Sequence, residues 1–194
     1  MRAKSIKGTS FNEIATAFDE SMADSFTPTL AILFLSIKQD CVAVAEVLDK
    51  KEVSVFGATP AGKFIDGELK AGSIVLLLLD INPTYFKIQL EEATEETLST
   101  TAKKIAETAK NTFNKPAFLI AATLFTNAEV IVNAIEEKFE NEVTLFGAQA
   151  VEVIGRLKME GHPVLEGIFK NNPTTTHPIR KNGEPWRTYC RCCT

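Results

Sequence analysis

The sequence predicts an α/β fold in which two internally duplicated helix-strand-helix-strand units form a mostly parallel mixed sheet with helices packed on it. Three observations predict this class. Segments with helical apolar spacing alternate with short runs that are apolar throughout. Turn-forming residues bound these runs. A Phe-Gly-Ala triplet follows the same order of elements twice, at Phe56-Gly57-Ala58 and Phe146-Gly147-Ala148, with an offset of 90 residues.

The first unit begins with a predicted helix over residues 11–26, where apolar side chains recur at spacings of three and four. Ser10 and Glu13 fit a capping box, in which each side chain accepts a hydrogen bond from the other residue's backbone N–H. Residues 30–35 are apolar at every position. This run predicts a strand that is covered on both faces, as in a parallel sheet.

The second half of this unit contains a helix and a parallel strand. Asp40 is placed to cap a helix that runs to residue 50, and residues 53–56 predict the strand. Residues 73–81 and 85–88 are then expected to pair as an antiparallel hairpin because only a short Asn-Pro link separates them. The apolar face of the helix is predicted to consist of Val42, Ala45, Val47 and Leu48.

The second unit repeats the order of the first. Asn127 is placed to cap its second helix. Beyond Gly147, residues 151–159 and 163–169 fit two further strands. The four elements of this unit are expected at residues 97–113, 117–122, 128–139 and 143–146.

The domain organisation is predicted as one folded body over residues 1–170 and an unstructured or atypical tail over residues 171–194. The tail is rich in Pro, Thr and Asn-Gly turn signals. It also holds three of the four cysteines, at Cys190, Cys192 and Cys193. Their spacing does not match the ligand pairs of a structural zinc site, so no metal is expected.

Charge and hydropathy exclude several classes of function. The net charge of −4 argues against a nucleic-acid partner, since phosphate binding requires clustered Lys and Arg. No stretch approaches the roughly 20 apolar residues of a membrane span. The N-terminus lacks the apolar core of an export signal, so we expect a cytoplasmic protein.

No constellation of catalytic residues is recognisable in the sequence. The two histidines, His162 and His177, both lie beside prolines and away from any candidate nucleophile. The acidic run at residues 91–96 is typical of an exposed helix start. We therefore expect neither enzymatic activity nor a cofactor.

A ligand site is expected beyond the carboxyl ends of the strands, where loops and helix N-termini meet. If the two copies pack as pseudo-symmetric halves, the equivalent loops border one cleft that suits an amino acid or another small polar metabolite. The glycines also fit simple turns, and the Gly57 to Gly62 loop lacks the Gly-Lys-Ser/Thr ending of a phosphate loop. The candidate ligand-binding residues are Gly57, Thr59, Gly62, Gly147 and Gln149.

The chain resembles the N-terminal part of the FIST (F-box and intracellular signal transduction) sensory domain. The resemblance implies a cytoplasmic input domain that binds a small ligand such as an amino acid and signals to partners such as histidine kinases. Two positions depart from the family pattern: Lys63 replaces an acidic residue, and residues 147–152 replace a Gly-Gly-x-x-Gly-Asp ending. The residues that carry the resemblance are Ala3-Lys4-Ser5, Pro28-Thr29-Leu30-Ala31-Ile32-Leu33-Phe34, Val55-Phe56-Gly57-Ala58-Thr59-Pro60-Ala61-Gly62-Lys63-Phe64, Gly72-Ser73-Ile74-Val75-Leu76-Leu77 and Lys115-Pro116-Ala117-Phe118-Leu119.

Two hypotheses about function follow. The first is a non-catalytic small-ligand sensory domain. The second is an interaction module, the remnant of a truncated two-domain sensor, which acts by forming a homodimer through an uncovered apolar surface. Within the resemblance, the chain is expected to stand alone or to be truncated, because a second FIST domain would begin where it stops.

Overall fold

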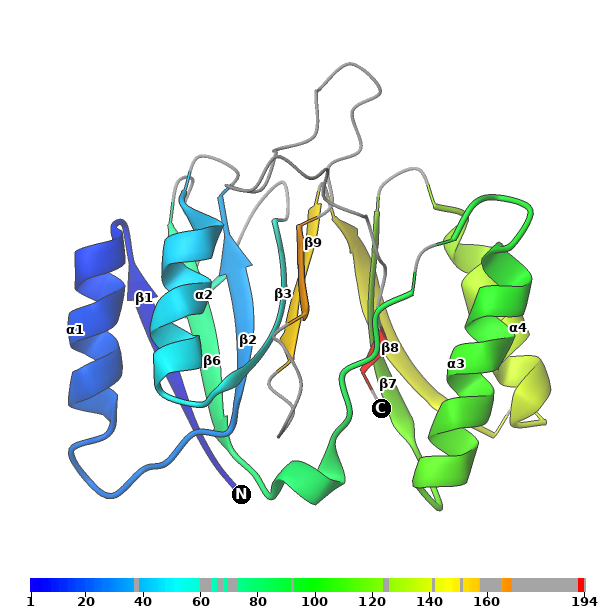
Figure 1. The fold of residues 1–194 in the computed structure, drawn as a ribbon, viewed down its shortest axis with the longest axis horizontal. Helices are drawn as coiled ribbons and strands as arrows, with labels where there is room; N and C mark the ends of the chain where they lie inside the picture. Colours follow the sequence, from blue (N-terminus) through cyan, green and yellow to red (C-terminus); the bar gives the residue numbers. More distant parts are fainter. Residues whose placement is uncertain are drawn as a thin grey trace. The chain divides into compact units, whose positions relative to one another are not determined.

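Figure 1 shows the computed structural model of the chain, which divides into two compact units that are described separately. The predicted limits of the folded body, residues 1–170, stay a prediction. Side chains are described up to residue 150, apart from residues 64–65 and 68–69. The units are Met1–Phe86 with Ile154–Glu166, and Lys87–Val153 with Gly167–Thr194. The structure describes residues 1–36, 39–59, 64–65, 68–69, 73–91, 93–123, 126–140, 142–150, 152–157, 165–168 and 192–193.

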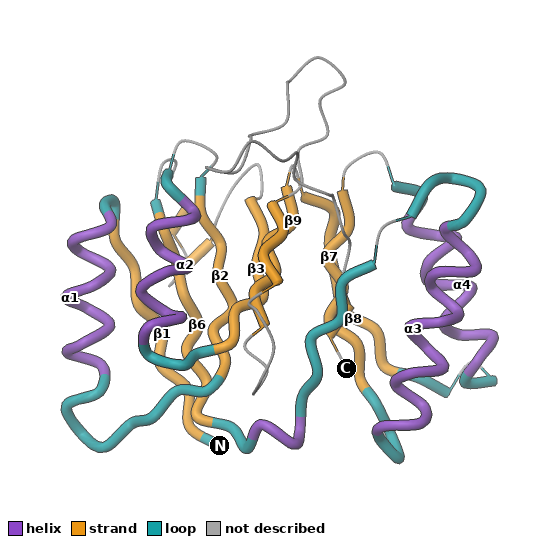
Figure 2. Tube along the Cα trace, viewed as in Figure 1, coloured by secondary structure: helices purple, strands orange, loops and turns teal. Residues whose placement is uncertain are grey.

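The first unit is built on a six-stranded sheet whose order is β1-β6-β2-β3-β9-β10. Helices α1 and α2 cover one face of β1, β2, β3 and β6, where their apolar side chains form a single core (Figures 1 and 2). Strands β4 and β5 pair separately. The elements are β1 (Arg2–Gly8), α1 (Phe11–Ser21), β2 (Leu30–Leu35), α2 (Cys41–Lys50), β3 (Ser54–Thr59), β4 (Phe64–Ile65), β5 (Glu68–Leu69), β6 (Ile74–Asp80), β9 (Glu152–Leu157) and β10 (Leu165–Ile168).

Helix α1 starts at the predicted cap but ends earlier than predicted. The Ser10 Oγ accepts a hydrogen bond from the Glu13 backbone N–H at 3.3 Å, as in a capping box. The Glu13 carboxylate, however, accepts from the backbone N–H of Thr9 at 2.8 Å, not from that of Ser10. This bond, with further bonds from the Thr9 and Ser10 side chains, lowers the pKa of Glu13. The chain leaves the helix after Ser21, so Phe26 joins the core from a loop.

Helix α2 confirms its predicted cap and corrects its predicted face. The Asp40 Oδ1 accepts from the Ala43 backbone N–H at 3.0 Å. Val44 is buried in the core, whereas Val42, which the spacing placed on the apolar face, is 41% exposed. Ala45 and Leu48 are buried as predicted.

The predicted hairpin between residues 73–81 and 85–88 is wrong. Strand β6 pairs antiparallel with β1 on one side and with β2 on the other, so no edge remains for a third strand. The chain instead turns through a 3-10 helix, η1 (Pro83–Tyr85), which Asn82 caps through a 3.0 Å bond from the Thr84 N–H. Strand β1, which pairs with β6 instead, is not predicted by the sequence pattern.

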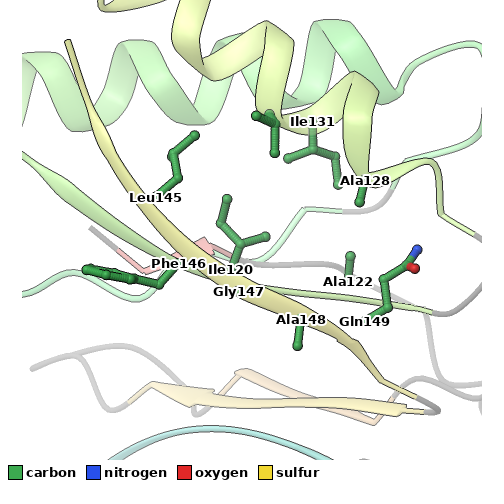
Figure 3. A pocket seen from close by; sticks show the side chains of 10 residues that line it. Ile120, Ala122, Ala128, Ile131, Leu145, Phe146, Gly147, Ala148 and Gln149 are labelled. Atoms are coloured by element: carbon green, nitrogen blue, oxygen red, sulfur yellow. The ribbon is translucent and has the colours of Figure 1, made fainter. Parts of the chain in front are cut away.

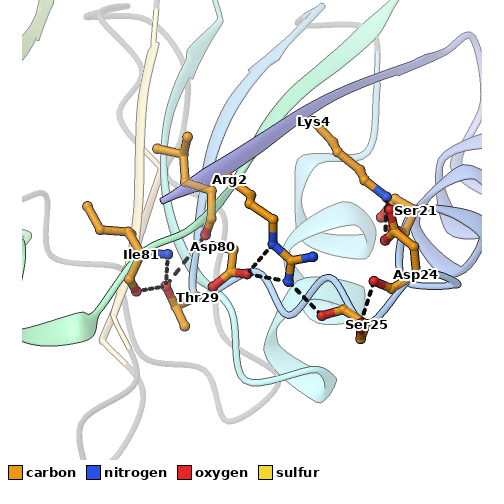
Figure 4. Close-up of polar contacts among 9 residues, drawn as sticks. Arg2, Lys4, Ser21, Asp24, Ser25, Thr29, Asp80 and Ile81 are labelled. Atoms are coloured by element: carbon orange, nitrogen blue, oxygen red, sulfur yellow. Dashed lines mark hydrogen bonds and ion pairs between the residues drawn. The ribbon is translucent and has the colours of Figure 1, made fainter.

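Basic side chains anchor β1 to its neighbours (Figure 4). The Arg2 guanidinium bonds the Asp80 carboxylate at 2.7 and 3.0 Å and the Ser25 carbonyl at 2.6 Å. The Lys4 ammonium bonds the Ser21 carbonyl at 2.5 Å and lies 5.0 Å from the centre of the Phe26 ring. These contacts hold the outermost strand of the sheet against the α1 to β2 connection, although exposed ion pairs alone contribute little stability.

The second unit contains two helices on a small sheet whose order is β11-β7-β8. Helices α3 and α4 pack against each other and bury one face of β7 (Figure 1). Phe118 is at the centre of this core and meets the Phe139 ring edge-on at 5.7 Å. The predicted helices and strands are confirmed here to within a few residues. The elements are α3 (Leu98–Thr112), β7 (Ala117–Thr123), α4 (Ala128–Lys138), β8 (Thr144–Ala150) and β11 (Cys192–Cys193).

The order helix, strand, helix, strand occurs in both units, as α1-β2-α2-β3 and α3-β7-α4-β8. In each, the two strands are parallel neighbours, with Gly57 opposite Leu33 and Gly147 opposite Ile120. This recurrence agrees with the predicted repeat, while an origin by duplication stays an inference. Of the predicted tail, only the backbone of β11 belongs to the described residues, so its predicted lack of structure stays a prediction.

Candidate functional site

A pocket of about 350 Å³ lies in the second unit between α4 and the strands β7 and β8 (Figure 3). We call it the α4 pocket. Its volume falls at the small end of the range of about 300–1,000 Å³ that is usual for ligand sites. Its lining residues are Ile120, Ala122, Ala128, Ile131, Val132, Leu145, Phe146, Gly147, Ala148 and Gln149.

The topology of the unit explains where this pocket lies. Strands β7 and β8 are parallel, so their carboxyl ends share one edge of the sheet, and α4 follows directly after the carboxyl end of β7. The Asn127 Oδ1 caps the helix there by accepting from the Glu129 backbone N–H at 3.2 Å. Ligand sites of parallel α/β sheets gather at this end of the strands. The α4 pocket reaches this edge at Gln149, while most of its lining lies along the strands and α4.

Regular spacing brings the lining side chains together. Leu145, Gly147 and Gln149 alternate along β8 and so belong to one face of the strand. On α4, Ala128 is followed by two branched side chains, Ile131 and Val132, three and four positions later, on the same side of the helix. At Gly147 the backbone of β8 approaches that of Ile120 on β7 closely.

Polar contacts gather at the Gln149 end of the pocket. The Gln149 Nε2 donates to the carbonyl oxygens of Thr123, at 3.4 Å, and Thr126. The hydroxyls of Thr123 and Thr126 bond each other at 2.8 Å. This network joins the end of β8 to the connection between β7 and α4, and thereby fixes the rim of the pocket.

The five predicted site residues do not all lie together. Gly147 and Gln149 line the α4 pocket, and their role in ligand binding stays a prediction. Gly57 and Thr59 belong to β3 in the first unit, where Thr59 is buried. Gly62 lies outside the described residues. The prediction that equivalent loops of the two copies border one cleft stays a prediction.

The glycines lie inside strands and not in loops after them, which corrects the predicted strand ends. A Cβ added to Gly57 would stand 2.2 Å from the Leu33 carbonyl oxygen, and one added to Gly147 would stand 2.4 Å from that of Ile120. Close approach of the neighbouring backbone therefore explains why glycine occupies both positions.

Sequence reasoning missed the apolar residues that make most of the pocket wall. Most of them lie in the predicted elements at residues 117–122, 128–139 and 143–146, to which no role beyond the fold was assigned. One signal could have found the pocket, namely the small residue Ala128 beside the branched Ile131 and Val132 on α4. A small residue in an otherwise bulky apolar layer leaves volume unfilled.

The side chains that line the pocket are uncharged. None of the ten lining residues carries an ionisable side chain. Among the described residues, no group of three His, Cys, Asp or Glu side chains could hold a metal ion. The side chains of Cys190, Cys192, Cys193 and His177 lie outside that part of the chain. No helix within the described ranges is long and apolar enough to cross a membrane.

Comparison with known proteins gave one match. A family model described as the FIST N domain matches residues 29–169, which is well over half of the chain. No curated protein and no solved structure matches the sequence.

Proposed function

Because this chain belongs to the FIST N domain family of signal-transduction sensory domains, we propose that it senses a small molecule bound in the α4 pocket. The observation that carries this proposal is the position of the pocket. It reaches the carboxyl end of β8 at Gln149, beside the start of α4, and extends back along β8 to Leu145. Ligands of parallel α/β folds bind at this place.

The structure around the pocket suits a sensor. Ala128 and Gln149, at the rim, are both exposed, so a small molecule can enter from solvent. Ile131, deeper in the wall, belongs to the core of the unit. A ligand that contacts Ile131 and the rim together would stabilise the start of α4 against the sheet. We propose that this stabilisation of the start of α4 is the signal.

We propose that the role is non-catalytic and that the signal passes to a cytoplasmic output protein such as a histidine kinase. The supporting observation is the make-up of the pocket wall, in which Gln149 is the one residue with a polar side chain. General acid–base or nucleophilic chemistry needs an ionisable or nucleophilic side chain within reach of the substrate.

A second candidate function is protein interaction through a homodimer. One observation favours it: Phe146 is 60% exposed on β8, the last strand in the order β11-β7-β8. An exposed aromatic side chain on an edge strand is a common feature of docking surfaces. The equivalent Phe56 of the first unit is buried.

A thermal-shift screen against amino acids and common metabolites tests the sensing function. A ligand that binds only the folded state raises the melting temperature, by an amount that grows with ligand concentration. We expect at least one compound to do so. The rise should be lost in Ala128→Leu, whose side chain projects over the pocket.

The matched control is Asn133→Leu, which adds the same side chain at an exposed position of α4 that does not line the pocket. This variant should respond to the compound as the original chain does. If no compound shifts the melting temperature and light scattering shows a concentration-dependent dimer, the sensing function is wrong and the interaction function is favoured.

A further inference from the structure

Resting on the sensing function proposed above, we infer that the ligand of the α4 pocket is an uncharged molecule with an apolar body, and not a zwitterionic amino acid. This reverses the ligand class that topology and family resemblance suggest. The inference comes from the chemistry of the wall, from the hydrogen bonds already made at the rim, and from the positions of the charged side chains of the unit.

Apart from Gln149, the side chains of the wall offer contacts to apolar groups, and none of them is charged. Ile120, Ile131, Val132 and Leu145 supply branched aliphatic side chains, and the alanines supply methyl groups. A charged group that leaves water for such surroundings needs an opposite charge or several hydrogen bonds to compensate for its lost hydration. An amino acid brings two such groups, an ammonium and a carboxylate.

The amide side chains of Gln149, at the rim, and of Asn127, next to Ala128, already make hydrogen bonds within the protein. The Gln149 NH₂ donates to the carbonyl oxygens of Thr123 and Thr126. The Asn127 Oδ1 accepts from the Glu129 backbone N–H as the cap of α4. Drawing either amide toward a ligand's ammonium or carboxylate would break a contact that fixes the rim.

Charged side chains of α3 and α4 pair away from the pocket. Lys103 binds Glu137 at 2.7 Å, and Lys138 binds Glu107 at 2.9 Å, so both pairs link the two helices. Glu129, in the first turn of α4, is exposed and is not a lining residue. Within the described residues, the pocket wall therefore holds no counter-charge for an amino acid.

The test compares compounds that share one apolar body and differ in charge. Three pairs serve: 4-methylpentanamide with leucine, 3-phenylpropanamide with phenylalanine, and indole-3-propanamide with tryptophan. Each is titrated into the full chain by calorimetry at pH 7. We expect at least one amide to bind about tenfold or more tightly than its amino acid. Ala128→Leu should weaken the binding of that amide, and Asn133→Leu should leave its affinity unchanged.

The outcomes separate the two proposals. Suppose that an amino acid binds as tightly as its amide and that Ala128→Leu weakens the binding of both equally. This result overturns the inference of an uncharged ligand, while the sensing function stands. If none of the six compounds binds and the thermal-shift screen finds no ligand, the sensing function fails and the inference fails with it. An amide that binds but is unaffected by Ala128→Leu overturns the assignment to this pocket.

Discussion

Replacing Phe118 with alanine is expected to destabilise the second unit by about 3–5 kcal/mol, the usual cost of removing a buried phenylalanine ring. The side chain is fully buried on β7, and its ring meets that of Phe139 at 5.7 Å. Removing it leaves a cavity among α3, α4 and β7 that the surrounding side chains fill only in part. Urea unfolding, monitored by circular dichroism, measures the loss.

The matched control is Phe146→Ala on the adjacent strand β8. Its ring is 60% exposed, so the same chemical change should cost less than about 1 kcal/mol. Equal losses for the two variants would show that Phe118 is not at the centre of a packed core, and the description of the second unit would be wrong.

Replacing Gly57 with alanine is expected to cost the first unit about 2–3 kcal/mol. The new Cβ would stand 2.2 Å from the Leu33 carbonyl oxygen and 2.9 Å from the Leu33 Cβ, closer than real Cβ contacts. Strand β3 would have to shift away from β2, which is the situation of an overpacked core. Alanine also lowers the conformational entropy of the unfolded chain, which stabilises the folded state by about 0.4–1 kcal/mol. This stabilisation offsets only part of the cost.

Gly8→Ala provides the comparison within the same unit. Its Cβ would meet side-chain atoms of Glu13 and Ile14 at 3.0–3.2 Å and no facing backbone. Small movements of those side chains can relieve the contact, so the loss should be clearly smaller than for Gly57→Ala in the same urea experiment. A neutral Gly57→Ala would contradict the close approach of β2 and β3.

Much of the fold could be predicted because local signals and tertiary structure agree. Asp40 and Asn127 both stand immediately before amphipathic segments, and each caps the predicted helix. The runs that contain Leu33 and Ile120 are short and apolar throughout, a pattern that favours the buried strands observed. In these places the same residues satisfy both propensity and packing, so pattern and structure coincide.

The wrong hairpin and the unrecognised strand β1 have a common cause, which is strand pairing between distant parts of the chain. Strand β1 carries alternating polar residues and was not recognised, yet it pairs along its whole length with β6, some 70 residues later in the sequence. The false hairpin after Asp80 followed from that omission. Nothing in a local window of sequence shows which of two possible neighbours a strand such as β6 will take.

The lining of the candidate site could be predicted only in part, because the sequence does not show which side chains lie opposite each other. Gly147 was found because it repeats Gly57, and Gln149 because it follows the second Phe-Gly-Ala triplet. Ala128 and Ile131 were missed because a small or branched residue on an amphipathic helix is usually predicted to pack in the core. Whether such a residue fills a layer or borders an opening depends on the volume of the side chains opposite.

The most direct test of the proposed sensing site is methyl NMR of the chain labelled at Ile, Leu and Val. Each of the three amides and three amino acids is titrated in turn. We predict concentration-dependent shifts for the methyl groups of Ile131, Val132 and Leu145, with Ile14 and Leu48 of the first unit unchanged. Shifts confined to the first unit, or no shift with any of the six compounds together with a thermal-shift screen that finds no ligand, would contradict a ligand site at the α4 pocket.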